Sequence, residues 1–541
     1  MRPIREKLFL TCLFVFAMMF FFRPFTAAAQ IPPDAGVILQ DTLLPDIRPM
    51  DPSVEFTPQG QAISDITPGG SVIEIQNLRI TGNSVFSEEE ITKAVGDVSG
   101  KSFDLAGLRA IANRISLFYR TNGYPFAYAY IPEQRVTGGE IVIEVIEGRY
   151  GKVYATGDPS LVPSAAGFLK RLKPGNVIET KSLERSLLIL GDQPGVELSP
   201  VIRPGAETGT GDLDVEVSPG ERFSGQVTFD NHGNIYYGEY RGEIALRMNR
   251  VLAFGDEISF RSIFSDENLW LGQIEYSLPI GSYGLRGHLG YAHTAYELGS
   301  PFDGYTGLAK VSFAGLSYPL VRSPMANLLV NTEYRHKELD NELLEISYEK
   351  KTSNSWMVAL QFDRRDRFGR GGITYGEVSV TSGSINSDNP GSIQGSFTKG
   401  NIQLNRLQNL PSAFTLFLSA SAQWADTNLD SSESFTLGGA NGVRAYPQGE
   451  AWGSEGWLAR AELRYSINGW WTPYIFYDTG YIDSDAEDNS RSLAGAGIGV
   501  RYNRGAWSLN IAAAWKTSGG DARSVENQRD PQIWVTLGYR F

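Results

Sequence analysis

The sequence predicts a mainly β fold in which a 16-stranded transmembrane antiparallel β-barrel follows two small β-α-α-β-β domains. Three observations lead to this prediction. The chain begins with an export-type segment, residues 71–220 contain the same α/β plan twice, and residues 221–541 alternate apolar and polar side chains without helical stretches. At about 20 residues per strand and turn, residues 221–541 provide about 16 strands.

The composition excludes several classes of protein. The net charge of −13 and the pI near 5.0 argue against a nucleic-acid-binding protein, which would carry a basic face. The 25 Tyr, 28 Phe, 10 Trp and 59 Gly suit many strands with tight turns and interfacial aromatic girdles. The single cysteine, Cys12, lies in the export segment, so we expect no disulfide, no thiolate nucleophile and no Cys-ligated metal in the mature chain.

Residues 1–29 have the pattern of a secretory signal peptide. Basic residues at positions 2–7 precede the apolar run Leu8–Phe22, and Ala27–Ala29 offers a small-residue cleavage site. A membrane anchor is the alternative, but this run of about 15 residues is short for a span of about 20. The segment therefore predicts an exported protein.

Residues 30–70 are rich in proline. The apolar residues of Ala35–Leu44 predict a short helix, and the prolines around it indicate an extended linker. A disordered tail is an equal alternative, and the sequence leaves open whether the helix plugs the barrel.

The two small domains are expected at residues 71–149 and 150–220. In the first, strand-like residues 72–80 precede a capping box at Ser87–Glu90 and a second helix that begins at Asp104 and stops at Asn122-Gly123; strands 126–132 and 140–147 follow. In the second, strand 152–156 precedes helices at 163–172 and 181–190 and strands at 196–202 and 212–218.

The C-terminal strand decides between a soluble sandwich and a membrane barrel. Alternation alone fits both, because a sandwich points its apolar face inward and a barrel points it at lipid. Leu537, Tyr539 and Phe541 continue the alternation to the end of the sequence. A strand that ends on Phe with an aromatic residue two positions earlier is similar to the sorting signal of bacterial outer-membrane barrels, so we expect the barrel.

One long connection inside the predicted barrel carries a single arginine among glycines. Residues 432–456 lie between strand-like runs 415–424 and 457–467, and a connection of this length is usually functional or disordered. Alternation puts Phe476, Asp478 and Gly480 on the lumen face of a later strand. We therefore expect the loop to enter the pore, with Arg444 bound to Asp478; an exposed Arg444 is the alternative.

The motifs in this order and spacing resemble two-partner secretion transporters, the haemolysin secretion/activation type of outer-membrane protein, which have two polypeptide-transport-associated (POTRA) domains. The resemblance covers almost the whole mature chain. It rests on Gly82-Asn83, Tyr119–Tyr124, Val145–Gly148, Leu183–Leu188, Pro194–Val196, Phe229–Gly233, Val443–Tyr446 and Phe476-x-Asp478-x-Gly480. One departure is Ala445, where the family usually has Gly; Gly takes positive φ at little cost and Ala does not.

The resemblance implies an outer-membrane translocator with its POTRA domains in the periplasm. Its partner would be an unfolded exoprotein with an N-terminal secretion domain, adhesin-like or haemolysin-like, which the POTRA domains bind, partly by β-augmentation, and the barrel passes to the cell surface. Outer-membrane lipids and the barrel-assembly machinery would be further partners. The implied lock between loop and barrel comprises Val443, Arg444, Tyr446, Phe476, Asp478 and Gly480, and the implied client-binding residues are Tyr119, Gly123, Tyr124 and Leu187.

Other functions fit the sequence less well. A barrel-assembly insertase of the same superfamily typically has more POTRA domains, and a passive porin needs neither these domains nor the arginine loop. The four histidines show no HExxH spacing, and there is no G-x-S-x-G motif, so we expect no catalysis, metal or cofactor. The charged run Asp363–Arg367 is expected to end a strand at a turn near Gly369–Gly372.

Overall fold

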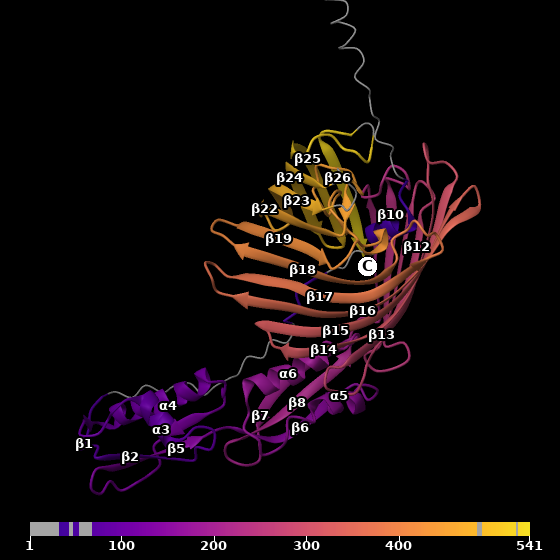
Figure 1. The fold of residues 1–541 in the computed structure, drawn as a ribbon. Helices are drawn as coiled ribbons and strands as arrows, with labels where there is room; N and C mark the ends of the chain where they lie inside the picture. Colours follow the sequence, from indigo (N-terminus) through magenta and orange to yellow (C-terminus); the bar gives the residue numbers. More distant parts are fainter. Residues whose placement is uncertain (1–31, 43–46, 53–67, 484–489, 526–527) are drawn as a thin grey trace, which may run out of the picture.

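The computed structural model describes residues 32–42, 47–52, 68–483, 490–525 and 528–541 (Figure 1). The predicted signal peptide and most of the predicted linker lie outside the described residues. Within the described part of the chain, no helix is long and apolar enough to cross a membrane.

A closed antiparallel barrel of 16 strands forms the larger part of the molecule, which confirms the predicted fold class. Each strand pairs with its neighbours in chain order, and β26 pairs with β9 to close the ring. The strands are β9 (Phe223–Asp230), β10 (Arg241–Asn249), β11 (Glu257–Ser265), β12 (Trp270–Pro279), β13 (Arg286–Glu297), β14 (Tyr305–Arg322), β15 (Ala326–Leu343), β16 (Ile346–Asp366), β17 (Gly372–Ser387), β18 (Gly395–Asn409), β19 (Phe414–Ala425), β22 (Glu455–Tyr465), β23 (Trp471–Asp483), β24 (Arg491–Arg504), β25 (Trp507–Ser518) and β26 (Gln532–Arg540).

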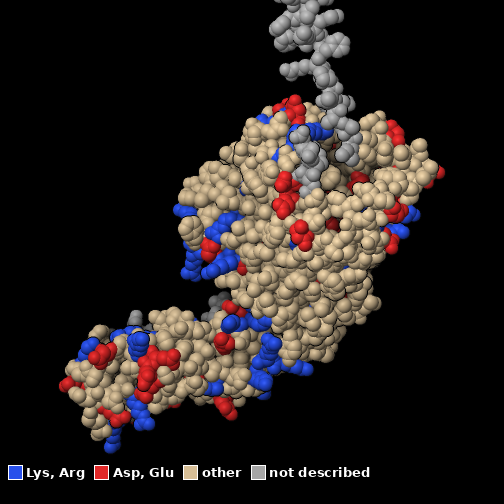
Figure 2. All heavy atoms as spheres, in the orientation of Figure 1, with Lys and Arg blue, Asp and Glu red and all other residues tan. Residues whose placement is uncertain are grey.

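Side chains alternate between the lumen and the outer face of the barrel. In β23, Phe476, Asp478 and Gly480 are buried, whereas Ile475 and Tyr477 are exposed. The same alternation leaves large apolar side chains exposed on the outer face of most strands. Figure 2 shows a broad area of the barrel wall that is nearly free of charged residues, as a lipid-facing surface requires.

The barrel closes at the C-terminal strand. Five residues of β26, from Thr536 to Arg540, pair with β9, and Phe541 exchanges two backbone hydrogen bonds with Gly225 at 2.8 and 2.9 Å. Leu537, Tyr539 and Phe541 all point outward and are more than a third exposed. The predicted sorting residues therefore lie at the closing seam, on its lipid-facing side.

The first small domain packs two helices, α3 (Glu88–Val95) and α4 (Leu105–Thr121), on a three-stranded sheet. The sheet has the order β2-β5-β4, from β2 (Asn77–Thr81), β5 (Glu140–Ile146) and β4 (Tyr128–Tyr130). The predicted strand at residues 72–75 does not join it: β1 (Ile73–Glu74) pairs with β3 (Ser102–Phe103) instead. Alternation cannot reveal this, because it does not specify a partner strand.

The second small domain has the same plan. Helices α5 (Val162–Leu169) and α6 (Thr180–Gly191) cover a sheet of order β6-β8-β7, built from β6 (Arg149–Gly157), β8 (Thr210–Pro219) and β7 (Val196–Pro204). This domain lies against one end of the barrel, near β14, and the first domain lies farther away (Figure 1). We call this end of the barrel the near end. Because β9 starts there, the connections after β9, β11 and every second strand lie at the far end.

A buried carboxylate joins the two small domains. The Glu147 side chain accepts hydrogen bonds from the backbone amides of Ser84 and Val85 at 2.6 and 2.7 Å and from the Tyr119 hydroxyl at 3.2 Å, and it pairs with Arg149 of β6 at 3.0 Å. Burial raises the pKa of Glu147, but these hydrogen bonds outweigh burial and hold the pKa below its ordinary value.

Glu147 is therefore expected to make the first small domain acid-sensitive. Since its folded-state pKa is depressed, its contribution is complete above about pH 4.5 and is lost as the pH falls below that value. Glu147→Gln should destabilise the domain by about 1.5–3 kcal/mol at pH 7 and flatten this pH dependence. Hydrogen exchange in the full chain measures both effects, with the exposed Glu140→Gln as control. An unchanged pH dependence in Glu147→Gln would contradict the assignment.

Candidate functional site

The connection between β19 and β22 turns back from the far end into the barrel. Residues 426–454 contain a short 3₁₀ turn, η1 (Ser431–Glu433), and the strand pair β20 (Phe435–Thr436) and β21 (Trp452–Gly453). We call residues 432–456 of this connection the pore loop. Its apolar residues Leu437, Val443, Ala445, Tyr446 and Ala451 are buried in one cluster with the inward-facing wall residues Leu458, Tyr474, Phe476, Leu493, Ala512 and Trp534.

Arg444 is bound to two carboxylates of the barrel wall. Its Nε and Nη2 donate to the two oxygens of Asp478, both at 2.7 Å, and its Nη1 donates to Glu462 Oε1 at 2.7 Å. The backbone amide of Arg444 also donates to Asp478 Oδ2 at 3.2 Å, and the Phe476 ring centroid lies 3.6 Å from the guanidinium carbon. Arg444 and Glu462 are nearly buried, and Asp478 is completely buried.

This burial makes the Arg444 contact strong and difficult to break. Burial alone would lower the pKa of Arg444, but the hydrogen bonds and charges of Asp478 and Glu462 raise it above its ordinary value. A bidentate guanidinium–carboxylate pair fixes orientation as well as distance. Removing one partner from such a buried pair typically costs about 3–5 kcal/mol, because the other charge stays uncompensated.

Glu462 is a site residue that the sequence analysis did not identify. It lies on β22 opposite Phe476 of β23, and it also pairs with Arg464 at 2.7 Å and Arg501 at 3.0 Å. Its position on the polar face of an alternating strand was a usable signal. The sequence does not reveal the register between β22 and β23, and only this register brings Glu462 beside Asp478.

The other predicted loop and wall residues lie around this contact. Val443 is buried and donates its amide to Leu437 O at 2.7 Å, and the Tyr446 hydroxyl donates to the carbonyl of Ser518 at 2.8 Å. Gly480 admits the loop, since a Cβ there would lie 2.3 Å from Leu437 Cδ1. The absence of a side chain at Gly480 therefore lets the Leu437 side chain of the pore loop pack directly against the wall.

Ala445 fits this site without a positive φ, so the departure from the family's glycine does not strain the backbone. Its methyl group is buried against Gly495 of β24: a Cβ at Gly495 would lie 2.3 Å from Ala445 Cβ. Gln528 donates to the Ala445 carbonyl at 2.6 Å. The loop thus has Ala445 where the family usually has glycine, and Gly495 on the facing wall leaves room for the methyl group of Ala445.

A second part of the barrel wall, on β15–β18, holds the connection between β19 and β22 through lysines. Lys337 of β15 and Lys399 of β18 pair with Glu433 of η1 at 2.7 and 2.8 Å, and Lys351 of β16 pairs with Asp430 at 2.8 Å. Burial would raise the pKa of Glu433, but the two lysines outweigh it and lower the pKa to about 2. The connection is therefore held by charged contacts at two places on the barrel wall.

The predicted helix near the N-terminus lies beside the pore loop inside the barrel. Helix α2 (Ala35–Thr42) is buried with far-end residues such as Tyr237 and Leu298. Its Asp41 accepts hydrogen bonds from the Tyr237 hydroxyl and from Gln448 Nε2 of the loop, the latter at 2.8 Å. Burial raises the pKa of Asp41, and these hydrogen bonds oppose the rise.

The N-terminal turn of α2 is fixed by similar polar contacts. Asp34 accepts from Ser431 Oγ of η1 at 2.7 Å and pairs with Lys351 at 3.3 Å. The backbone amide of Ala35 donates to Asn341 Oδ1 at 3.0 Å. At Gly36 a Cβ would lie 2.2 Å from Ser431 Oγ, so only glycine allows the helix to pack directly on η1.

The residues suggested for client binding occupy different environments. Tyr119 and Leu187 are completely buried in the cores of the two small domains, so they offer no surface to a client and their assignment as client-binding residues is wrong in this structure. Gly123 has a φ of +93° and accepts a hydrogen bond from the Thr180 amide at 2.9 Å, at the junction of the domains. Tyr124 is half-buried beside Tyr119.

Comparison with known proteins identifies the family. A family model described as haemolysin secretion/activation protein ShlB/FhaC/HecB matches residues 209–502, and a model of the ShlB-type POTRA domain matches residues 73–148. The heme/hemopexin transporter protein HuxB of Haemophilus influenzae (strain 86-028NP) is 27% identical over an alignment of 480 residues that covers 83% of each chain. The outer membrane transporter CdiB of Dickeya dadantii is 22% identical over 485 residues, covering 83% of this chain and 84% of CdiB.

A solved structure has the same architecture. CdiB from Escherichia coli superposes with a TM-score of 0.72 at 20% identity, over 91% of this chain and 94% of CdiB. The first model covers more than half of the chain and includes most of the barrel, the pore loop and Asp478. The chain therefore belongs to the haemolysin secretion/activation (ShlB/FhaC/HecB) family, the POTRA-bearing outer-membrane transporters of two-partner secretion.

Proposed function

We propose that this transporter binds an unfolded exoprotein with its POTRA domains, passes it through the barrel to the cell surface, and closes the lumen between rounds with α2 and the pore loop. The observation that carries the gating part is that one lumen contains both elements, joined by the Asp41–Gln448 and Asp34–Ser431 hydrogen bonds. A polypeptide that occupies the lumen has to take the place of at least one of them.

We assign different roles to the two elements because their contacts differ in strength. Several links of α2 to the loop are single hydrogen bonds, and each of these contributes about 0.5–1.5 kcal/mol net, so water or a client can replace them. The Arg444 contact is a buried triad of charges. We therefore propose α2 as the removable plug and Arg444, Asp478 and Glu462 as the fixed anchor of the loop, with Val443, Tyr446, Phe476 and Gly480 shaping its seat.

Capture of the client is assigned to the sheet edges of the POTRA domains. Strands β2 and β7 each lie at one edge of a three-stranded sheet. An extended segment can add to such an edge through backbone hydrogen bonds, which suits an unfolded client. The buried Tyr119 and Leu187 support these domains from within.

The proposed client is a secreted protein with an N-terminal secretion domain, adhesin-like or haemolysin-like. The name of the relative HuxB refers to heme and hemopexin, and that of CdiB names no cargo, so the relatives do not define the client of this chain. Outer-membrane lipids would cover the apolar outer face, and the barrel-assembly machinery would insert the barrel. The proposal includes no catalytic step.

Breaking the anchor should reduce secretion while the barrel still assembles. Arg444→Ala removes the ion-pair partner of the completely buried Asp478, whereas Asp478→Ala leaves Arg444 paired with Glu462, so we expect a stronger defect from Arg444→Ala. The double variant should be no worse than Arg444→Ala. Secretion is measured by exoprotein in the medium, and assembly by heat-modifiable electrophoretic migration.

The exposed ion pair between Arg529 and Glu239 at the far end provides the control. Exposed pairs contribute about 0–1 kcal/mol, so Arg529→Ala should secrete normally. Normal secretion by both anchor variants would show that Arg444 and Asp478 are not the anchor of the pore loop.

The packing of Ala445 against Gly495 predicts a compensating pair of substitutions. Gly495→Ala puts a methyl group into the space that Ala445 fills, so it should loosen the loop and lower secretion severalfold. Adding Ala445→Gly should restore secretion, because it vacates that space. The same secretion assay tests both variants, and Gly391→Ala, whose Cβ would come no closer than 3.5 Å to Asn389, is the control. Failure of Ala445→Gly to rescue would contradict the proposed packing role.

Deletion of residues 72–217 separates the possible functions. The proposed function predicts loss of one secreted protein while the barrel still inserts. A general loss of other outer-membrane barrels would instead indicate an insertase, and unchanged secretion would indicate a passive channel. Proteomic comparison of the medium and of the outer membrane, with and without the deletion, distinguishes these results and identifies the client.

A further inference from the structure

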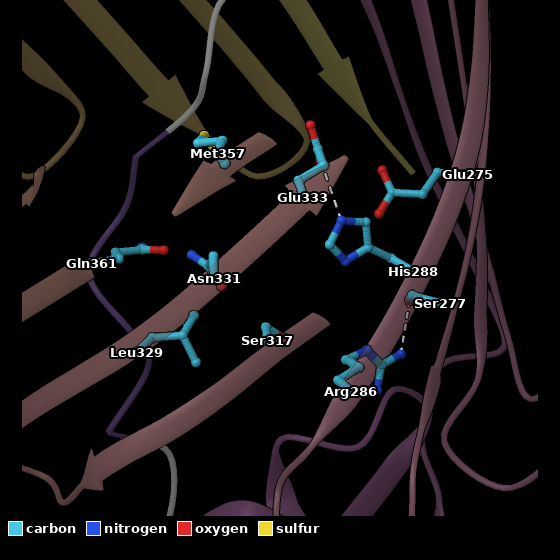
Figure 3. A pocket seen from close by; sticks show the side chains of 10 residues that line it. All are labelled: Glu275, Ser277, Arg286, His288, Ser317, Leu329, Asn331, Glu333, Met357 and Gln361. Carbon is cyan, nitrogen blue, oxygen red and sulfur yellow. Dashed lines mark hydrogen bonds and ion pairs between the residues drawn. The ribbon is translucent and has the colours of Figure 1, made fainter. Parts of the chain in front are cut away.

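A short extended segment, residues 47–52, lies on the inner wall of the barrel at its periplasmic end. The segment follows α2 in the sequence and contacts the wall formed by β14, β15 and β16. In Figure 3 it is the indigo trace that passes beside Gln361. Its place is directly above the second POTRA domain, where a polypeptide leaving that domain would enter the barrel (Figure 1).

Wall side chains hold this segment by its backbone. Asp363 accepts from the Met50 amide at 3.1 Å, and Arg365 Nη2 donates to the Met50 carbonyl at 2.8 Å. Arg322 Nη2 also donates to the Asp51 carbonyl at 2.8 Å, and Gln361 Nε2 donates to the Arg48 carbonyl at 3.2 Å. All four contacts use groups that almost every residue of any polypeptide has, so they can recognise an extended backbone of almost any sequence.

The wall groups are fixed by one another. Asn327 Nδ2 donates to both oxygens of Asp363 at 3.1 Å, and Asn327 Oδ1 accepts from Arg322 Nη1 at 3.1 Å. Arg365 Nη1 binds Asp363 Oδ1 at 3.0 Å. Arg322, Asn327 and Asp363 are each at most 4% exposed, so the site is a preorganised polar cluster and not a set of mobile surface charges.

The same cluster reaches the second POTRA domain. Arg322 forms a bidentate pair with Asp192 at the end of α6, with distances of 2.6 and 2.8 Å. One arginine thus contacts a POTRA domain, the barrel wall and the internal segment together. A polypeptide passing from the POTRA domain to the barrel would meet this arginine at the entrance.

A cavity of about 330 Å³ continues the site into the lumen (Figure 3). Gln361 contacts residues 47–52 and also lines the cavity. Leu329 lines the cavity too, and it is paired with Gln361 across the strands. Deeper in the cavity, His288 contacts Glu333 at 3.3 Å. This mixed lining gives side chains of different kinds room beside a backbone held at the wall.

We propose that Arg322, Gln361, Asp363 and Arg365 form a binding site for the backbone of an extended polypeptide, which residues 48–51 fill in the resting state and the client fills in transit. This inference rests on the proposed function, because it supplies the first contact that the client makes inside the barrel. In the resting state residues 48–51 therefore act as an inhibitor, and the client displaces them by forming equivalent hydrogen bonds with the same wall groups.

Photo-crosslinking in secreting cells tests the site. The probe is the exoprotein identified by its loss from the medium, fused to a tightly folded domain that stalls it in the barrel. A photoreactive amino acid at position 329 should crosslink the stalled exoprotein. At position 360 it should not, because Leu360 is 42% exposed on the outer face, one residue from Gln361. Asp363→Ala should lower the yield of the crosslink between position 329 and the exoprotein about tenfold, because the exoprotein backbone loses one hydrogen bond to a charged group.

Two variations examine backbone recognition. Replacing the stalled stretch of the exoprotein with alanine and serine should leave the crosslink at position 329 unchanged; its loss would overturn backbone recognition. In the transporter, Met50→Pro removes the amide that Asp363 binds and should increase channel conductance in planar bilayers, whereas Met50→Ala keeps that amide and should not. Equal conductance of the two variants would overturn the resting-state occupancy.

The outcomes separate this inference from the proposed function. If the exoprotein crosslinks the POTRA domains and reaches the surface but never crosslinks position 329, the backbone site is wrong and the proposed function stands. If no protein depends on this chain for release, the proposed function is wrong, and the backbone site falls with it.

Discussion

The buried contact of Arg444 with Asp478 and Glu462 is the constraint on which the interior of this barrel depends. Asp478 is completely buried and Arg444 is its ion-pair partner, so the pore loop cannot leave the wall without a large electrostatic cost. With the loop fixed, Gln448 and Ser431 are held where α2 can bind them. The plug is therefore held partly by the loop, and the loop partly by Arg444.

The interior combines two kinds of contact that serve different purposes. Apolar packing around Val443 and Tyr446 gives the loop a defined shape on the wall formed by β22–β26. Polar contacts dominate on the wall formed by β14–β18, where lysines and Asp363 hold the loop, the plug and residues 47–52. The backbone of another chain can take over the single hydrogen bonds that hold residues 47–52, so this part of the second wall is where elements can be exchanged.

Alternation and motif spacing were sufficient to predict the barrel, the two small domains and the lumen face that carries Asp478. They failed to predict contacts between residues that depend on which strands are neighbours and on the register between them. Glu462 was on the polar face of its strand in the sequence, but only strand register brings it to Arg444. For the same reason, the lysines opposite η1 and the separate β1–β3 pair were not predicted. Motif resemblance misled at Tyr119 and Leu187, because a family motif can mark a core position as well as a binding surface.

The lysine wall has a consequence for ion flow. Lys337, Lys351 and Lys399 belong to the barrel, whereas most of their acidic partners, Asp34, Asp430 and Glu433, belong to the plug and the loop connection. Departure of α2 removes Asp34 from Lys351 and leaves that wall more positive than in the closed barrel. The open channel should therefore be more permeable to anions, relative to cations, than the closed barrel, so a change in ionic selectivity would report electrically that α2 has left.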